Sequence, residues 1–308
     1  MSEAIRLVAV VGPTAAGKTE LGIALAERFN GEVVSVDSMQ IYRWMDIGTA
    51  KPSPDQLSAV PHHLIDIINP DQEYNAGLFA TDADRVIQQL VQERKTAILV
   101  GGTGLYLRAL IHGIIDVPPV PQHIREEVRT MMAEQGVNAC HQRLAELDPQ
   151  SARQLHPNDI SRVSRALEIV LATGNSIQRF QEHHRFRQQR YQVVYLGSTW
   201  PREDLYQRIN KRVCRMVEEG LLDETRSLLD RGYGERYPAM NAIGYKQAVA
   251  CIRGKMSQTA MIADIQQKSR HYAKKQLTWF GKNPDIRWLE NNHLSQGEID
   301  SVARFLLH

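Results

Sequence analysis

Cysteine is scarce in this sequence of 308 residues. Cys140, Cys214 and Cys251 are odd in number and far apart, and no CxxC pair or Cys/His ligand spacing occurs. These absences argue against a disulfide framework and a zinc site, and they fit a reducing compartment. No window approaches the roughly 20 apolar residues of a membrane span, and the early run "LVAVV" is too short for a signal sequence. We therefore expect a cytoplasmic protein with no membrane partner.

Neither sign of charge dominates the chain, because 37 Lys/Arg stand against 35 Asp/Glu. The two signs are nevertheless separated along it. Residues 1–116 carry 9 Lys/Arg and 14 Asp/Glu, a balance of −5, whereas residues 201–290 carry 17 Lys/Arg and 11 Asp/Glu, a balance of +6. A basic C-terminal part suits a polyanionic partner, although a solvated helical surface gives the same pattern.

A glycine-containing loop follows the first expected strand. "IRLVAVV" (5–11) is a short β-branched run that predicts a buried parallel strand, and residues 19–29 have the spacing of a helix. Between them "GPTAAGKT" satisfies the pattern GxxxxGK[ST]. Its backbone N–H groups and the helix N-terminus can hold phosphate oxygens, while Lys18 neutralises the distal phosphate and the Thr19 hydroxyl ligates Mg²⁺. The predicted diphosphate-binding residues are Gly12, Pro13, Thr14, Ala15, Ala16, Gly17, Lys18 and Thr19.

This loop predicts a bound diphosphate without identifying the group attached to it. The guanine-reading NKxD motif of GTPases is missing. "TAILVGG" (96–102) ends in glycine, whereas many ATPases place a Mg²⁺-coordinating Asp at the end of such a strand. The absent motifs argue against a GTPase and against an ordinary ATPase.

The order of the expected elements indicates an α/β fold. "EVVSV" (32–36) and "TAILV" (96–100) predict further strands, and residues 76–94 predict a helix before the latter. Strands that alternate with helices imply a parallel sheet covered on both faces, here of the P-loop NTPase type.

A change of character near residue 117 indicates a second domain. "VPPVP" (117–121) predicts a stiff linker, after which the chain is helical, polar and rich in Arg. "YQVVYLGS" (191–198) returns to strand character, and helices dominate from Pro201 to about Arg287. We expect a catalytic core of residues 1–117 and 191–308 with an all-helical domain of residues 118–190 inserted into it.

Two further polar residues follow expected strands, at the edge of the sheet where ligands bind in open α/β folds. Asp37 comes directly after the second strand, where it can act as a general base, assist Mg²⁺ binding, or merely cap the next turn through Ser38 and Gln40. Thr103 lies between glycines after the third strand, in either a second phosphate-facing turn or a plain strand-to-helix turn.

The basic half contains helices with clustered cationic side chains. Arg208, Arg212 and Arg215 are spaced to share one helical face, which suits a leaving diphosphate or an exposed face paired with Glu218 and Glu219. "QKSRHYAKKQLTWFGK" (267–282) mixes Lys and Arg with aromatic residues, as nucleic-acid-binding surfaces do. Trp279 and Phe280 are equally suited to the core of a final helix.

Seven segments together resemble the bacterial tRNA dimethylallyltransferase family in order and spacing. They are "GPTAAGKT", "SVDSMQIYRWMDIGTAKP", "GGTGLYLRALI", "HPNDISRVSRALEI", "RINKRV", "MNAIGYKQ" and "RHYAKKQLTWF". The resemblance extends from about Val8 to Phe280. The loop alone is not specific, but its combination with "VDSMQIY" and "IGTAKP" is.

The resemblance implies transfer of a dimethylallyl group from dimethylallyl diphosphate to N6 of the adenosine 3′ to the anticodon of tRNA. In that family the loop holds the diphosphate of the prenyl donor. Lys18 and Thr19 are then expected to hold diphosphate and Mg²⁺, with Asp37 as general base and with Thr103 and Arg212 on the departing diphosphate. The adenine is expected to be flipped out of the anticodon loop and read by residues 37–40.

The resemblance also implies a tRNA-binding surface, with the helical insertion embracing the anticodon stem-loop. One departure is that Gly281 precedes Lys282, where the family often has a basic residue directly after "TWF". The zinc-finger extension of eukaryotic relatives is absent. The tRNA-contacting residues implied are Asp37, Ser38, Met39, Gln40, Arg125, Ser161, Arg162, Val163, Ser164, Arg165, Ala242, Ile243, Gly244, Tyr245, Lys246, Gln247, Lys274, Lys275, Gln276, Thr278, Trp279 and Phe280.

The principal alternative is a small-molecule or nucleoside kinase, which would also use Lys18, Mg²⁺ and a nearby Asp. The basic C-terminal half and the match beyond the loop argue against it. A non-catalytic RNA-binding ATPase is a third class, and the missing downstream Asp argues against that. Nothing in the sequence demands a dimer, so we expect a monomer.

Overall fold

A computed structural model describes residues 4–115, 117–184 and 190–307. The described residues form two compact units, one within Met1–Ile111 and Arg190–His308, the other within His112–Gln189. The helix before the predicted linker, α4 (Gly104–His112), ends where the second unit begins. The boundary therefore falls at residues 111/112 and not at the predicted 117/118.

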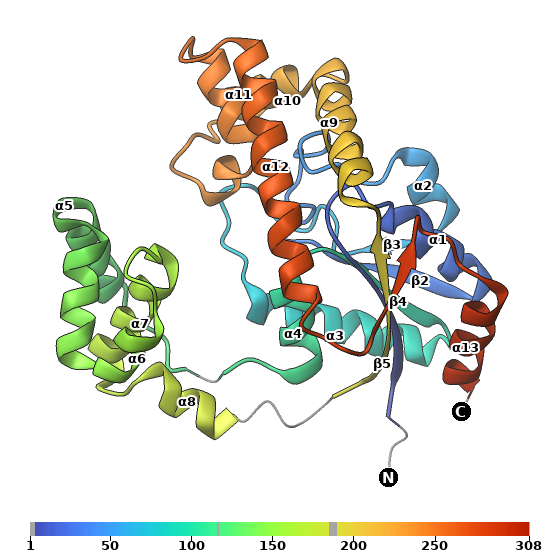
Figure 1. Cartoon of the computed structure of the whole chain (residues 1–308), viewed down its shortest axis with the longest axis horizontal. Coiled ribbons are helices and arrows are strands. Elements are labelled where there is room, and N and C mark those ends of the chain that lie inside the picture. Colours follow the sequence, from blue (N-terminus) through green and yellow to red (C-terminus); the bar gives the residue numbers. More distant parts are fainter. Residues whose placement is uncertain (1–3, 116, 185–189, 308) are drawn as a thin grey trace. The chain divides into compact units, whose positions relative to one another are not determined.

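A six-stranded sheet forms the centre of the first unit (Figure 1). All its strand pairs are parallel, in the order β3-β2-β4-β1-β5-β6. The predicted P-loop-type parallel sheet flanked by helices is confirmed. The strands are β1 (Arg6–Val11), β2 (Gly31–Val36), β3 (His62–His63), β4 (Thr96–Gly101), β5 (Gln192–Thr199) and β6 (Ile286–Glu290).

The two edge strands, β3 and β6, were not predicted. β3 has only two residues, too few to leave a pattern. β6 has five residues, of which only Ile286 and Leu289 are buried, and it begins at the end of the stretch where helices were expected. It pairs with β5 beside Gly197, where a Cβ atom would lie 2.5 Å from Trp288 Cε3, so the glycine makes room for the edge strand.

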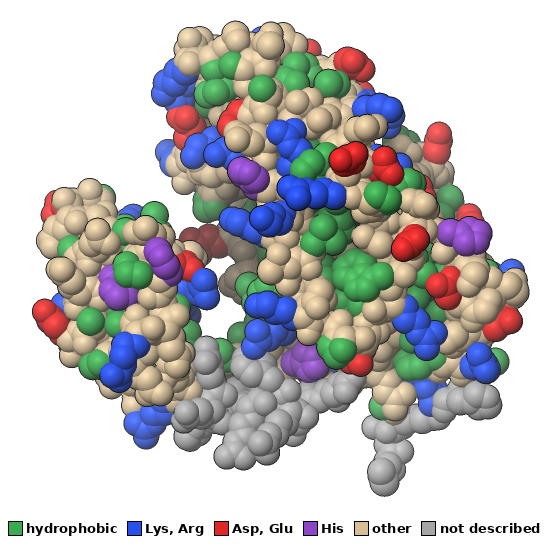
Figure 2. Space-filling model, viewed as in Figure 1, with side chains coloured by type: hydrophobic (Ala, Val, Ile, Leu, Met, Phe, Trp, Pro, Cys, Tyr) green, Lys and Arg blue, Asp and Glu red, His purple; other side chains and the backbone are tan. Residues whose placement is uncertain are grey.

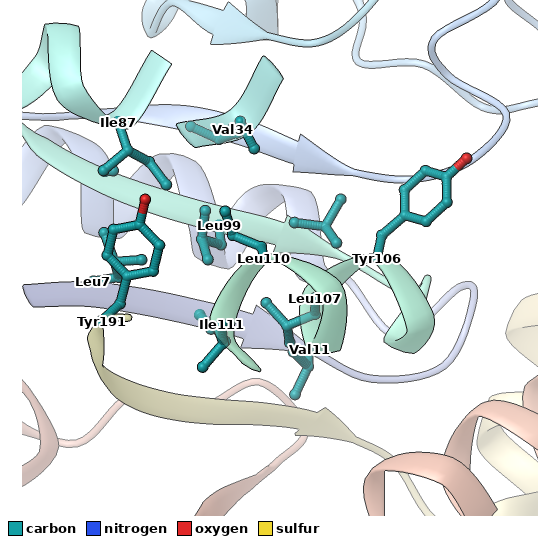
Figure 3. Packing of buried hydrophobic residues seen from close by; sticks show 14 of the residues in the cluster. Leu7, Val11, Val34, Ile87, Leu99, Tyr106, Leu107, Leu110, Ile111 and Tyr191 are labelled. Atoms are coloured by element: carbon teal, nitrogen blue, oxygen red, sulfur yellow. The ribbon is translucent and has the colours of Figure 1, made fainter. Parts of the chain in front are cut away.

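Alternation along the buried central strand divides the core into two layers. Leu7, Ala9 and Val11 pack with α3 (Ala76–Gln92) and α4, as Figure 3 shows for part of this cluster. Val8 and Val10 face the other way, toward α1 (Lys18–Arg28) and α13 (Gln296–Leu307). Helices thus cover both faces of the sheet and leave its strand ends for the site.

The C-terminal helices form a second core beside the sheet. This core includes the buried Met45, from the segment after β2, together with Met240 and Tyr245. A smaller cluster packs Ala16 of the phosphate loop against Leu205, Ile209 and Ala273. The helices of this part are α9 (Arg202–Glu218), α10 (Leu221–Asp230), α11 (Tyr245–Ile252) and α12 (Gln258–Phe280), with a short 3₁₀ turn at Pro238–Asn241; α2 (Pro54–Ala59) lies earlier in the chain.

The second unit is helical throughout its regular elements. Val128, Cys140, Leu144, Val163 and Leu167 form its core. Gly136, at φ 80°, interrupts the longest helix. Within the described residues, no helix of either unit is both long and apolar enough to cross a membrane. The helices are α5 (Gln122–Leu147), α6 (Pro149–Gln154), α7 (Ile160–Thr173) and α8 (Ile177–His184).

Candidate active site

The phosphate loop joins β1 to α1 through three residues with positive φ. Gly12 (141°), Ala15 (63°) and Gly17 (87°) give the chain the curvature that an anion-binding loop needs. A Cβ atom on Gly12 would lie 2.4 Å from the Ser198 carbonyl oxygen, so glycine is required there. Among the described residues no side chain caps the start of α1. The unpaired N–H groups of its first turn are therefore available to an anion.

Side-chain donors hold the carbonyl groups of the loop. These bonds fix the path of the loop backbone, so that its N–H groups, apart from that of Thr14, which Gln276 accepts, can face a phosphate. Arg208 also stacks its guanidinium group 4.2 Å from the centre of the Trp200 ring. The bonds run from Lys18 Nζ to Pro13 O (2.6 Å), Arg208 Nε to Ala15 O (2.9 Å), Ser198 Oγ and Trp200 Nε1 to Ala16 O (2.7 and 2.9 Å), and Asn292 Nδ2 to Gly17 O (2.7 Å).

Helix α12 connects the loop to the turn after β4. Gln276 accepts a hydrogen bond from Thr14 N (2.8 Å) and donates one to Gly102 O (3.0 Å). The glycines of this turn are explained by the same helix. A Cβ atom would lie 2.1 Å from Gln276 Nε2 at Gly102 and 2.0 Å from Trp279 Nε1 at Gly104. The "GGTG" segment is therefore a close-packing site for α12.

Asp37 and Thr103 follow β2 and β4 and lie beside each other. Asp37 Oδ1 accepts hydrogen bonds from Met39 N (2.8 Å) and Gln40 N (3.4 Å), so the turn cap considered from sequence does occur, with one oxygen. Thr103 Oγ1 accepts from Ser38 N (3.1 Å). The chain's own turn thus fixes the carboxylate and leaves Oδ2 as a further acceptor.

Two cationic groups share this site with the carboxylate. Burial, and after it the neighbouring Arg212, lower the pKa of Lys18 to about 8, although Asp37 and Glu20 act in the opposite direction. Burial likewise lowers the pKa of Arg212 against the effect of Asp37 and Glu20. Arg212 also donates to Thr14 Oγ1 at 3.2 Å. Asp37 and Glu20 offset the desolvation of the two cations only in part, so an anionic ligand beside Lys18 and Arg212 would stabilise both.

The donor groups fit a Mg²⁺ ion that arrives with a diphosphate. Thr19 stands at the start of α1 and Asp37 lies near Lys18 of the same loop. Over residues 4–115, 117–184 and 190–307 no group of three His, Cys, Asp or Glu side chains is placed to hold a metal ion. A hydroxyl with a nearby carboxylate and substrate phosphates is a usual Mg²⁺ environment, whereas an all-protein cage is not.

The three arginines expected on one face of α9, Arg208, Arg212 and Arg215, make different contacts. Arg212 donates to Thr14 Oγ1 beside Lys18 and Asp37, whereas Arg208 bonds the Ala15 carbonyl. Arg215 is exposed. A single helical face therefore provides one arginine in the site and one that supports the loop.

Several residues expected to contact tRNA are exposed on the first unit. Lys246, Lys274, Lys275 and Thr278 are exposed. The side chain of Trp279 is 43% exposed and packs with its other part on the turn at Gly104. Figure 2 shows Lys and Arg side chains gathered over α12. Ser38, Met39, Gln40, Ala242 and Ile243 are half-buried.

Other expected contacts lie in the interior and have to be corrected. Val163, Tyr245, Gln247, Gln276 and Phe280 are buried, which leaves their side chains no surface for RNA. Gly244 is buried as well, and its N–H donates to Gln247 Oε1. Helical periodicity explains the error, because a motif quoted as continuous letters includes the inward positions of its helix.

In the second unit, two expected contacts lie in one groove. Arg125 and Ser164 line it together with Arg129, Met132 and Ile160, between α5 and α7; its volume is about 410 Å³. Ser161 is exposed. Arg162 and Arg165 are exposed as well, each paired with a carboxylate three residues away, Asp159 and Glu168.

Sequence reasoning missed the groups that support the site. Tyr272 was noted only as one aromatic among basic residues. Its hydroxyl bonds the side chains of Thr103 and Gln276, and burial of that end, with Asp37 nearby, raises its pKa to about 12. The spacing of Tyr272 and Gln276, one helical turn apart, was the available signal. No sequence pattern indicated the roles of Asn292 and Ser198, since the residues that they bond are 275 and 182 positions away.

Comparison with known proteins places this chain in a family of transferases. A family model for IPP transferases matches residues 40–283. The chain is 48% identical over 285 residues to the tRNA dimethylallyltransferase of Geobacter sulfurreducens, covering 92% of each chain. It is 46% identical over 283 residues to that of Myxococcus xanthus, again covering 92% of each. The chain therefore belongs to the IPP transferase family, and it is a transferase.

Solved structures agree with this assignment. The tRNA isopentenylpyrophosphate transferase of Bacillus halodurans is 40% identical, with a TM-score of 0.71 over 98% of this chain and 95% of that one. A eukaryotic dimethylallyltransferase described as acting on tRNA is 28% identical, with a TM-score of 0.81 over 98% of this chain and 77% of that one.

The lowered pKa of Lys18 predicts pH-dependent anion binding. Below about pH 8 the free amine is protonated. Above that pH a bound diphosphate must draw a proton back onto it, so the affinity falls as pH rises, by up to about tenfold per unit. Calorimetry with inorganic diphosphate from pH 7 to 9.5, in buffers of different ionisation enthalpy, measures the proton uptake. Lys18→Met is the control that isolates titration of the ligand, and an equal pH dependence in both proteins contradicts the assignment.

Removing one donor to the loop carbonyls should weaken diphosphate binding. Asn292→Asp keeps the shape but has no amide N–H for Gly17 O, so we expect a Kd about 5–10-fold higher, the value of one hydrogen bond. Asn291→Asp is the matched control, because Asn291 also has positive φ but is exposed. Equal affinity in both variants, measured by calorimetry, would show that the loop does not need this support.

Proposed function

We propose that this protein transfers a dimethylallyl group from dimethylallyl diphosphate to tRNA, at N6 of the adenosine 3′-adjacent to the anticodon. The names of its relatives support tRNA prenylation in general. The observation that carries the proposal is the placement of Asp37 beside the two cations of a phosphate loop, Lys18 and Arg212. Such a site places a general base next to cationic groups that can bind a leaving diphosphate.

In the proposed reaction, the N6 amine of adenine attacks the allylic C1 carbon of the donor. The new N–C bond forms as the C1–O bond to the diphosphate breaks, and its electron pair leaves on the diphosphate oxygen. Lys18 and Arg212 stabilise that charge, and Thr103 hydrogen-bonds it from the turn after β4. The proton on N6 passes to the Asp37 carboxylate, whose Oδ1 the chain already holds.

Mg²⁺, bound through Thr19 and the diphosphate, would supply further neutralisation of the leaving group. The chain's own part is to orient the diphosphate. The loop N–H groups do so because their carbonyls are held by Arg208, Trp200 and Asn292. Gln276 ties this loop to the turn that bears Thr103, so both sides of the reacting carbon are fixed together.

The tRNA is proposed to contact α12 through Lys274, Lys275 and Trp279, and the insertion domain to embrace the anticodon stem-loop through Arg125, Arg162 and Arg165. The adenine must leave its stack to reach Asp37, so base flipping is part of the proposal. The exposed basic groups serve the phosphates and Trp279 a base. We expect the protein to act as a monomer in the cytoplasm.

The Asp37→Asn variant tests the base. The amide still accepts from Met39 N, so the turn should persist, while turnover should fall about 10²–10⁴-fold because the proton acceptor is lost. The measurement is transfer of radiolabel from dimethylallyl diphosphate to unmodified tRNA, with RNA affinity measured in parallel. Retained turnover would place the base elsewhere. Wild-type protein that transfers no label but hydrolyses ATP would overturn the prenyltransferase proposal itself.

Neutralising Lys274 and Lys275 to Gln should weaken tRNA binding and reduce its salt dependence. Two lost phosphate contacts are expected to lower the slope of log Kd against log salt by about 1.5. Arg94→Gln with Lys255→Gln removes the same charge from exposed positions on other elements of the first unit. If both double variants change the slope equally, only the net charge matters and α12 makes no direct contact.

A further inference from the structure

Glu224 binds the backbone of a segment that lies far from it in sequence. Its Oε2 accepts hydrogen bonds from Asp46 N (2.9 Å) and Ile47 N (2.7 Å), and its Oε1 accepts from Gly48 N (3.1 Å). Three successive N–H groups thus converge on one half-buried carboxylate from the first turn of α10. This is the arrangement by which backbone amides hold an anion. Nothing in the proposed reaction uses Glu224.

Tyr245 completes this attachment. Its hydroxyl donates to Glu224 Oε1 at 2.6 Å, and burial, with Glu224 beside it, raises its pKa and keeps it protonated. The ring packs so closely on Gly48 that a Cβ atom there would lie 2.5 Å from Tyr245 Cζ. The glycine of "IGTAKP" is therefore required by the contact that fixes Glu224.

The segment held by Glu224 ends on the side chain of Gln40. Ala50 has a φ of 48°, in the left-handed region, and its N–H bonds Ile47 O at 3.0 Å. This turn aims the Ala50 carbonyl at Gln40 Nε2, 3.1 Å away. A non-glycine residue keeps such a conformation only where its surroundings enforce it. Glu224 holds residues 46–48 directly before the turn, and the bond from Lys51 N to Asp46 O, at 3.1 Å, closes it on the other side.

The Ala50 carbonyl is what distinguishes the two ends of the Gln40 amide. The other end, Oε1, lies 3.0 Å from Ser35 Oγ, and a hydroxyl can donate or accept. A carbonyl only accepts, so it selects the orientation with Nε2 toward Ala50. The donor and the acceptor that Gln40 can offer to a ligand are thereby fixed. The Gln40 backbone N–H, in turn, bonds Asp37 Oδ1.

We propose that Glu224 is a positioning residue for base selection. It holds residues 46–50 so that the Ala50 carbonyl fixes the amide of Gln40, which then favours the donor and acceptor pattern of an adenine edge over that of a 6-oxopurine. A fixed amide matches adenine with two hydrogen bonds. An amide free to rotate matches either pattern. The inference rests on the proposed function, because it assumes that an adenine enters beside Asp37.

The test compares binding of two anticodon stem-loops, with adenosine or inosine at the acceptor position. In Glu224→Gln we expect the preference for adenosine, as a ratio of Kd values, to fall about tenfold, the discrimination that one such hydrogen bond provides. Affinity for inorganic diphosphate should not change. Asp223→Asn is the matched control, since this neighbouring carboxylate is exposed and pairs with Arg226. It should keep the wild-type preference.

A double-mutant cycle separates positioning from a general structural effect. In a Gln40→Leu background, Glu224→Gln should cause no further loss of preference, because the amide it orients is gone. Independent losses that add, or a wild-type protein that binds both loops equally, would overturn the inference. So would a Glu224→Gln protein that keeps the preference.

Tyr245→Phe provides the same test if Glu224→Gln does not fold. It removes only the proton donated to Oε1 and keeps the ring on Gly48, so a smaller fall in preference is expected, and an unchanged preference contradicts the proposal. Two different results separate the proposed function from the role of Glu224. Wild-type protein that transfers no label to tRNA refutes the proposed function, whereas normal transfer with selectivity retained in Glu224→Gln refutes only the role of Glu224.

Discussion

A phosphate loop holds an anion only if its N–H groups converge, and here side-chain donors to four of its carbonyl groups fix the path of the backbone. The rest of the first unit is arranged around this requirement. The donors come from the end of β5, from α9 and from the turn after β6. The strand order supplies them, because β5 lies next to β1, whose end carries the loop, and β6 lies next to β5. The edge strand β6 therefore supports the site, because it places Asn292 of the following turn beside the loop.

The charge of the site imposes a second constraint. Lys18 and Arg212 are desolvated together, which lowers the pKa of both, and the nearby Asp37 and Glu20 offset this only in part. Packing alone gives no reason to bring two cations together in this way. The arrangement is stabilised once an anion with several charges lies between them. Functional sites are where such locally unfavourable choices are expected, and here the imbalance matches a diphosphate in sign and place.

The sequence predicted the central strands, the phosphate loop and the placement of Asp37 and Thr103, because strand ends and a loop motif are local patterns. It missed β3 and β6, which are short edge strands whose existence depends on their neighbours. It also missed the supporting contacts of Gln276 and Asn292, whose partners lie 262 and 275 residues away. Tyr245, Val163 and Phe280 lie within segments expected to contact tRNA, but their side chains are buried. Letters in a motif do not say which side of a helix is buried, whereas the apolar stripe of Val163, Ala166, Leu167 and Val170 does.

Helix α12 joins the chemistry of the site to its basic surface. Tyr272 and Gln276 stand one turn apart and bond the turn at Thr103 and the loop at Thr14, while Lys274 and Lys275 point to solvent. The close contacts at Gly102 and Gly104 leave the helix no freedom to slide without displacing that turn. A chain of contacts therefore runs from α12 to Thr103 and, through Ser38, to the turn that holds Asp37. The helix that carries the exposed lysines is thus the same helix that bonds the turns around the carboxylate.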